Sequence, residues 1–132
     1  MTQSDALFEQ AENFLKQNKV QEAKDILEKL IQEDQQARFY SKLGTVNMIM
    51  GNREGGFEHF KKSFEIDPDH VPTLANLALF YSETGMYKKA LAFIQKALKL
   101  DPAQSNNYSI LALVLKHLNH PLEAIDTLLD MP

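Results

Sequence analysis

The sequence contains no cysteine, no tryptophan and no long apolar run. Without cysteine the chain cannot form a disulfide or a thiolate metal site, and this absence fits a reducing compartment. No segment approaches the roughly 20 apolar residues of a membrane-spanning helix. The first residues carry Asp5, Glu9 and Glu12 and lack the basic start and apolar core of a secretory signal. We therefore expect a cytoplasmic protein that does not associate with a membrane.

Positive charge is scarce as well. The formal net charge is −4, and residues 1–36 hold eight acidic and four basic residues. Nucleic-acid-binding proteins normally carry a stripe of basic residues. The nearest candidate here is a set of lysines that would share one solvated helix face: Lys88, Lys89, Lys96 and Lys99. We expect no nucleic-acid partner.

Glycine and proline number only five each, which permits long regular elements, and two segments reveal a repeat. Residues 64–68 (FEIDP) and 98–102 (LKLDP) are near copies whose prolines lie 34 residues apart. Repeats at this period are typical of stacked helical units. The spacing predicts a single repeat domain over residues 4–132, divided into repeats 4–36, 37–70, 71–104 and 105–132.

Small residues recur within this frame. Each repeat has Gly or Ala at its eighth and twentieth positions, twelve residues apart: Ala11 and Ala23, Gly44 and Gly56, Ala78 and Ala90, Ala112 and Ala124. Two antiparallel helices joined by a short turn come closest at one level, where only a small side chain fits. Larger apolar residues recur at helical spacing, with Asn47 an exception at the eleventh position. The pattern predicts an all-α protein made of helix hairpins.

The expected helix ends carry the residues that end helices. Gly51 and Gly85 occupy one repeat position, and Asn18 and Asn119 occupy its equivalent, where a left-handed backbone closes a helix. Pro72 and Pro121 fall where a first helical turn tolerates proline. Asp67-Pro68 and Asp101-Pro102 end the second helices, because proline disfavours helix in the residue before it. The expected helices span about 5–17, 21–33, 38–50, 54–66, 71–84, 87–100, 105–118 and 121–130.

These features resemble the tetratricopeptide repeat family over nearly the whole chain. The matching residues of the second repeat are Tyr40, Leu43, Gly44, Gly51, Gly56, Phe60 and Pro68, and those of the third are Leu74, Leu77, Ala78, Tyr81, Gly85, Ala90, Ile94, Ala97 and Pro102. The first repeat departs from the pattern, with Gln35 in place of the proline. The resemblance implies an α-α superhelix, or solenoid, of about four hairpins that binds a peptide or protein segment in a concave groove.

The resemblance also places ligand contacts at fixed positions of each first helix. In this chain they are Ser41, Lys42, Thr45, Met48, Asn76, Leu79, Ser82, Ser109, Leu113 and Lys116. In the family, an Asn at the position of Asn76 often hydrogen-bonds a peptide backbone, because an amide offers both donor and acceptor. A solvated polar residue is the alternative. The family's carboxylate-clamp set matches this sequence only at Asn76, so we expect no such clamp.

The sequence shows no catalytic constellation. His117, His120 and Glu123 form a string that could bind a metal, but Asn119 and Pro121 break the helix between them. We therefore expect no metal, no cofactor and no enzymatic activity in this segment.

The last eleven residues carry five apolar side chains: Leu122, Ile125, Leu128, Leu129 and Met131. Helical spacing cannot point all of them at the preceding hairpin, so we expect Ile125 and Leu129 to stay uncovered. Exposed apolar patches usually mark contact surfaces. Either the natural chain continues past Pro132, or two copies associate end to end through Leu122, Ile125, Leu128 and Leu129.

Three functional hypotheses follow. The first is a protein–protein interaction module that acts through its concave groove. The alternative is the N-terminal substrate-recognition part of a longer enzyme, such as a glycosyltransferase or sulfotransferase, since tetratricopeptide arrays precede such enzymes. The third is an assembly protein that dimerises or polymerises. The length of the natural gene separates the second hypothesis from the others.

Overall fold

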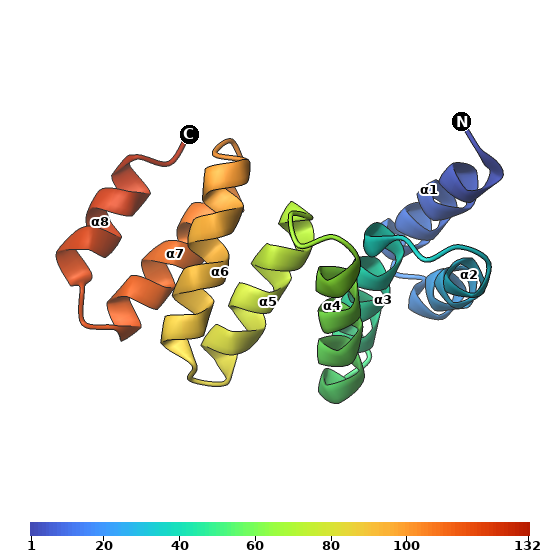
Figure 1. Ribbon diagram of the computed structural model, residues 1–132, viewed down its shortest axis with the longest axis horizontal. Coiled ribbons are helices and arrows are strands. Elements are labelled where there is room, and N and C mark those ends of the chain that lie inside the picture. The colour runs from blue at the N-terminus through green and yellow to red at the C-terminus, as the bar shows by residue number, and fades with distance from the viewer. The chain divides into compact units, whose positions relative to one another are not determined.

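The computed structural model describes all 132 residues and contains eight α-helices and no strand (Figure 1). The helices follow one another as four antiparallel hairpins. Their bounds are α1 Gln3–Lys16, α2 Val20–Glu33, α3 Ala37–Ile49, α4 Arg53–Ile66, α5 Val71–Glu83, α6 Tyr87–Leu100, α7 Ser105–His117 and α8 Pro121–Leu129. The predicted all-α fold of helix hairpins is confirmed.

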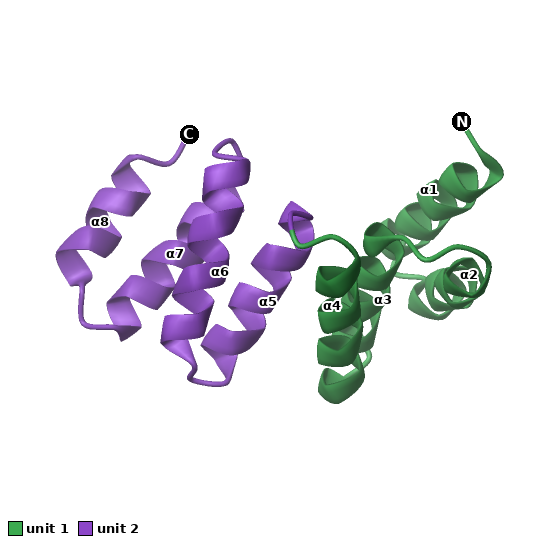
Figure 2. Cartoon of the chain, viewed as in Figure 1, with its two compact units in different colours: residues 1–68 green, residues 69–132 purple.

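The chain divides into two compact units of two hairpins each (Figure 2). Unit 1 is Met1–Pro68 and unit 2 is Asp69–Pro132. The division falls two residues before the predicted boundary between the second and third repeats. The single domain over residues 4–132 stays a prediction.

The helix ends agree with the sequence analysis. Gly51 and Gly85 have φ angles of 84° and 82°, and Asn18 and Asn119 have φ angles of 62° and 66°. These left-handed residues reverse the chain after each first helix. The start of α1 was expected two residues too late, because Thr2 caps this helix: its hydroxyl accepts a hydrogen bond from the Asp5 amide, and the Asp5 carboxylate accepts one from the Thr2 amide.

The predicted small residues lie where the two helices of a hairpin touch. In the α3/α4 hairpin, a Cβ atom added to Gly44 would lie 3.0 Å from the Gly56 carbonyl oxygen. One added to Gly56 would lie 2.7 Å from the Met48 sulfur. The alanines Ala11, Ala23, Ala78 and Ala90 are fully buried. The spacing of twelve residues therefore reports a close approach of backbones in each hairpin.

In unit 1, α3 packs on the α1/α2 hairpin and closes the core. Phe39, Leu43 and Val46 of α3 form one buried cluster with Leu27 and Leu30 of α2 and with the small residues of the hairpin. These three residues of α3 stand at the third, seventh and tenth repeat positions, which share one helix face. One face of a first helix is thus committed to the preceding hairpin.

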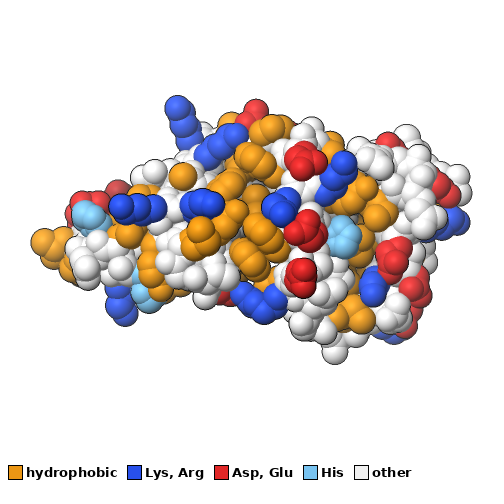
Figure 3. All heavy atoms as spheres, turned by 60° about the horizontal axis from the view of Figure 1, so that its bottom comes forward, with side chains coloured by type: hydrophobic (Ala, Val, Ile, Leu, Met, Phe, Trp, Pro, Cys, Tyr) orange, Lys and Arg blue, Asp and Glu red, His pale blue; other side chains and the backbone are white.

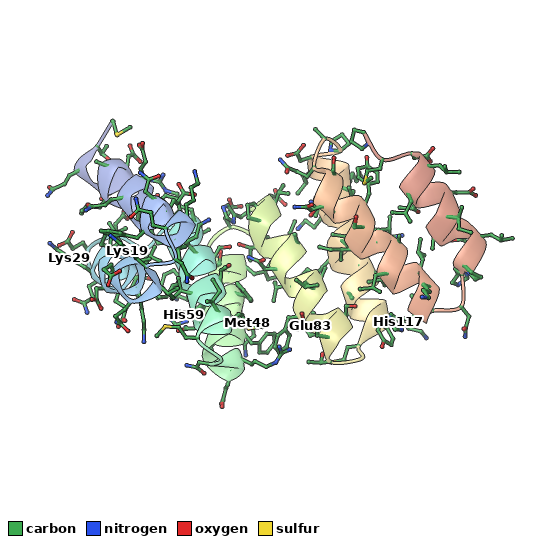
Figure 4. The ribbon with its side chains drawn as sticks, turned by 180° about the vertical axis from the view of Figure 1, so that it is seen from behind. Lys19, Lys29, Met48, His59, Glu83 and His117 are labelled. Atoms are coloured by element: carbon green, nitrogen blue, oxygen red, sulfur yellow. The ribbon has the colours of Figure 1, made fainter.

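Unit 2 repeats this arrangement, with α7 packed on the α5/α6 hairpin. The Tyr87 ring at the start of α6 stacks on the His117 ring at the end of α7, with centroids 4.5 Å apart and planes within 4°. Leu91 of α6 and Leu111 of α7 pack against the small cluster that joins α7 to α8. Figure 4 shows His117 at the end of α7.

Candidate functional site

The first helices of unit 1 border a hollow that the sequence analysis missed. It has a volume of about 500 Å³ and is lined by Met1, Asp5, Phe8, Glu9, Glu12 and Arg38. All but Arg38 lie on or just before α1, where acidic residues recur at helical spacing around Phe8. The spacing of Asp5, Glu9 and Glu12 is the feature of the sequence from which this hollow could have been predicted.

Ion pairs join α1 to α3 across this hollow. The Arg38 guanidinium lies 2.5 Å from the Asp5 carboxylate, and the Lys42 ammonium lies 3.4 Å from the Glu12 carboxylate. Arg38 also lies over the Phe8 ring, 5.0 Å from its centroid. The hydrogen bond from Arg38, helped by those from Thr2, lowers the pKa of Asp5 to about 2. The predicted ligand-facing Lys42 therefore already has an acidic partner in its own chain.

The other predicted ligand-facing residues of α3 contact neighbouring residues of their own chain. The Thr45 hydroxyl donates to the Ser41 carbonyl oxygen at 3.2 Å. The Met48 side chain lies against Gly56 of α4 and is half-buried (Figure 4). Ser41 is only 4% exposed. A serine side chain is short, so longer neighbours cover it easily, and Ser41 does not present its hydroxyl to solvent as expected.

In unit 2, the predicted residues of α5 differ in accessibility. Leu79 is 38% exposed, which is high for a leucine in the middle of a helix, and Asn76 is half-buried one turn before it. Ser82, at 6% exposed, is buried like Ser41. Of the predicted ligand-facing residues of α5, Leu79 and Asn76 are therefore the ones that a ligand could reach.

The structure joins two groups of predicted residues at the α7/α8 hairpin. A groove of about 500 Å³ lies between the two helices and is lined by Ser109, Ala112, Leu113, Lys116, Pro121, Ala124, Ile125 and Leu128. Ser109, Leu113 and Lys116 come from the predicted ligand-facing set, whereas Ile125 and Leu128 come from the predicted end contact. We call this hollow the α7/α8 groove. Leu122 and Leu129 are exposed but do not line it.

The apolar residues of α8 are largely uncovered. Only Ala124 of this helix is buried, and Ile125 and Leu129 are exposed as the sequence predicted. Hydrophobic side chains reach the surface on the side of unit 2 where α8 lies (Figure 3). Whether this surface mediates self-association stays a prediction.

The structure assembles no group of three His, Asp or Glu side chains that could hold a metal ion. Of the three residues considered above as metal ligands, His120 Nδ1 lies 3.3 Å from Glu123 Oε1. The third residue, His117, stacks on Tyr87 instead. None of the eight helices has both the length and the apolar character needed to cross a bilayer.

Helix hairpins of about 34 residues, in which α3 packs on the α1/α2 hairpin and α7 packs on the α5/α6 hairpin, define a helical-repeat protein of the α-α superhelix class. The chain belongs to the tetratricopeptide repeat family. One sequence profile of this family matches residues 35–103, and a second matches residues 5–37. The fold is that of a protein–protein interaction module.

Two curated proteins share part of this sequence. The chain is 36% identical over 69 residues to the Protein CTR9 homolog of Arabidopsis thaliana, covering 52% of this chain and 6% of that protein. It is 33% identical over 73 residues to the BBSome complex member BBS4 of Bos taurus, covering 55% of this chain and 14% of that protein. The chain thus matches only a small part of the length of either relative.

Solved structures share the fold at low sequence identity. MamA has a TM-score of 0.80 at 17% identity, with 98% of this chain and 76% of that chain covered. Pseudomonas aeruginosa PilF has a TM-score of 0.85 at 23% identity, with 94% and 57% covered. YrrB, described as a TPR protein with an unusual peptide-binding site, has a TM-score of 0.76 at 16% identity, with 98% and 69% covered.

Proposed function

We propose that this chain binds a peptide or protein segment on the exposed faces of its first helices. The observation that carries the proposal is the exposure of Leu79 on α5 and Leu113 on α7 beside accessible polar side chains. Exposed apolar residues flanked by polar ones are typical of contact surfaces.

The chemistry of these faces suits an extended or helical segment. Leucine side chains offer apolar contact area, and the Asn76 amide can both donate to and accept from a peptide backbone. In unit 1 the Phe8 ring offers apolar contact area beside the ion pairs of Asp5 with Arg38 and of Glu12 with Lys42. The description of YrrB as having a peptide-binding site supports a peptide ligand for a chain of this fold.

Whether this sequence is part of a longer protein, here called the parent, is a separate question. The chain spans 6% and 14% of its two curated relatives, so repeats of this kind occur within much longer proteins. If the parent is an enzyme, the same faces would recognise its protein substrate. We propose a non-enzymatic role for this sequence itself, in the cytoplasm, with a protein rather than a nucleic acid as its ligand.

The proposal is tested by capturing proteins on the immobilised 132-residue chain and mapping the captured segment to a synthetic peptide. Leu79→Glu should weaken binding of that peptide about tenfold or more, because a carboxylate would replace an apolar contact. Asn76→Ala should weaken it less, and its melting temperature is measured alongside because Asn76 is half-buried.

The matched control is Lys99→Glu, which changes charge by the same sign on an exposed residue of the second helix α6. It should leave peptide affinity within about twofold. If Leu79→Glu and Lys99→Glu have equal effects, the ligand does not lie on the first-helix faces.

A further inference from the structure

A separate hollow lies between the second helices of the first two hairpins, α2 and α4. It has a volume of about 270 Å³, and all its lining residues belong to unit 1. Its floor is formed by Leu43 and Asn47 of α3, which are both buried. The residues around this floor are mostly polar: Lys24, Glu28, Ile31, Gln32, Asn52 and His59. We call this hollow the α2/α4 pocket.

The α2/α4 pocket is polar at repeat positions that are apolar in unit 2. Lys24 and Asn47 hold positions 21 and 11 of their repeats. Their counterparts in unit 2 are Leu91 and Leu115, and Leu91 packs against the buried cluster that contains Leu115. At position 11 a buried amide therefore replaces a buried leucine. Such an amide costs folding free energy unless its hydrogen bonds are made.

The chain itself satisfies only part of the Asn47 side chain. Its amide nitrogen lies 2.7 Å from His59 Nδ1, which also lies 2.8 Å from the Gly55 carbonyl oxygen. The Asn47 amide oxygen has no hydrogen-bond partner in the chain. No fully buried side-chain oxygen or nitrogen lacks a partner, so this oxygen keeps accessible surface on a residue that lines the pocket. A ligand in the pocket could therefore donate a hydrogen bond to it.

The other polar groups around the pocket include both donors and acceptors. The Asn52 amide oxygen accepts from the Gly55 amide at 3.0 Å and caps α4, which leaves the Asn52 NH2 group unpaired. The Gln32 side chain makes no hydrogen bond within the chain and offers a donor group and an acceptor. The ammonium of Lys24 lies 3.9 Å from the Glu28 carboxylate, so their charges balance. The pocket thus favours a neutral group that both donates and accepts.

We propose that the α2/α4 pocket binds a glutamine side chain of a partner protein. A primary carboxamide carries one acceptor oxygen and two N–H donors. It can therefore donate to the Asn47 oxygen and accept from the Asn52 NH2 group, while the Gln32 amide can pair with either end. The methylene groups of a glutamine provide apolar contact for Ile31 and Leu43, which also line the pocket.

Size and charge select glutamine over other side chains. The volume of about 270 Å³ lies just below the roughly 300–1,000 Å³ of small-molecule pockets, so it suits one side chain. A charged side chain would be attracted by one member of the Lys24 and Glu28 pair and repelled by the other. This ligand site is independent of the first-helix faces, because its walls come from second helices.

The test titrates four capped tripeptides, acetyl-Ala-X-Ala-amide with X as glutamine, glutamate, methionine or glycine, into the isotope-labelled 132-residue chain. Amide NMR spectra report the side-chain NH2 signals of Gln32, Asn47 and Asn52 directly. The glutamine peptide should shift these signals saturably, with a dissociation constant on the order of 1–10 mM, because only one side chain is seated. Methionine lacks the polar atoms of glutamine and glutamate adds a charge, so both peptides should bind at least about fivefold more weakly.

Substitutions at exposed pocket residues make the test specific. Gln32→Glu and Asn52→Asp each replace an NH2 donor by a charged oxygen, and aspartate can still cap α4. Each should weaken the glutamine peptide about fivefold or more. Gln10→Glu is the matched control, since it makes the same change on an exposed residue of α1 that does not line the pocket. It should leave affinity unchanged, and circular dichroism checks that all variants fold.

Three results would overturn the proposal. The first is the absence of saturable shifts up to about 50 mM glutamine peptide. The second is equal affinity for the glutamine peptide and for either the glycine or the methionine peptide, which would make the backbone or apolar bulk the ligand. The third is an equal effect of Gln32→Glu and Gln10→Glu. Failure of the first-helix proposal is seen separately, as insensitivity of a captured ligand to Leu79→Glu.

Discussion

At the scale of single residues, Asp5 joins α1 to α3 through Arg38, which lies 33 residues later in the sequence. Its carboxylate accepts hydrogen bonds from Arg38 of α3 and from the Thr2 amide at the start of α1. The same residue therefore caps one helix and ties it to another. The sequence contains a local signal for the cap, Thr2 followed three residues later by Asp5, but none for the partner on α3.

The ion pair predicts a pH dependence. The folded pKa of Asp5, about 2, lies below the usual value of about 3.9. Ionised Asp5 thus stabilises the fold above about pH 4, and this contribution is lost as the pH falls from about 4 to about 2. Arg38→Ala should raise the pKa of Asp5 towards its usual value, measured by NMR titration of the side-chain carboxyl carbon.

The control for this titration is Lys24→Ala, which removes a cation of unit 1 that pairs with Glu28 instead. It should leave the Asp5 titration unchanged. A pKa of Asp5 that stays near 2 in the Arg38 variant would show that Arg38 does not make the pair in solution.

Asn47 breaks the apolar pattern at the eleventh repeat position, and the structure supplies the reason. The side chain is buried, and its amide nitrogen lies 2.7 Å from His59 Nδ1. The equivalent residues in the third repeat are Tyr81 and Phe93, whose rings stack 5.6 Å apart. One polar pair therefore replaces an apolar pair between the helices of a hairpin, and His59 is half-buried.

This pair should show energetic coupling. Asn47→Leu should cost about 0.5–1.5 kcal/mol of unfolding free energy, because it removes the contact with His59, while His59 Nδ1 keeps the Gly55 carbonyl oxygen as a partner. His59→Thr alone should also destabilise. The double variant copies the Leu115 and Thr127 pair of the fourth repeat, and it should be less destabilised than the sum of the single variants by about 0.5–2 kcal/mol. Urea denaturation measures all three, and strict additivity would contradict the contact.

At the scale of helices, the sequence predicts more than it does for single contacts. Four pairs of small residues, two glycines and two asparagines place eight helices to within about two residues, because these residues are required by close approach and by left-handed turns. The docking of a first helix on the preceding hairpin was not predicted residue by residue. It depends on side chains from three helices, which one-dimensional periodicity does not bring together.

The close approach of hairpin helices makes two substitutions disruptive. Gly56→Leu and Ala90→Leu would place a branched side chain where helices touch, and overpacking typically costs about 1–3 kcal/mol, occasionally more. Even a Cβ atom added to Gly56 would lie only 2.7 Å from the Met48 sulfur, which is closer than such atoms normally approach. Denaturant midpoints measure both effects.

Ala92→Leu provides the control, because Ala92 is an exposed residue of the same helix as Ala90. It should change the unfolding free energy by less than about 0.5 kcal/mol. Similar midpoints for the Ala90 and Ala92 variants would show that the repeat register is misplaced.

At the scale of the whole molecule, the candidate site was only partly predictable. The ten predicted ligand-facing residues divide between the two compact units, and in two of them, Ser41 and Ser82, the side chain is buried. Family positions identify a helix face but not how far a short side chain emerges from it. The α7/α8 groove combines residues of both predicted sets, and this combination depends on how α8 folds back on α7.

The unequal cover of the helices predicts a gradient of stability along the chain. With nine residues, α8 is too short to be stable by itself and depends on packing against its neighbours. Only Ala124 of this helix is buried. By contrast, α2 has the same role in the first hairpin and buries Ala23, Leu27 and Leu30 under α3. Amide hydrogens of α8 should therefore exchange with solvent at least about tenfold faster than those of α2.

Hydrogen–deuterium exchange of the 132-residue chain measures this difference, with protection factors corrected for intrinsic rates. Equal protection of α2 and α8 in the free chain would mean that the four hairpins unfold as one cooperative unit, so that the missing cover of α8 has no local effect on stability.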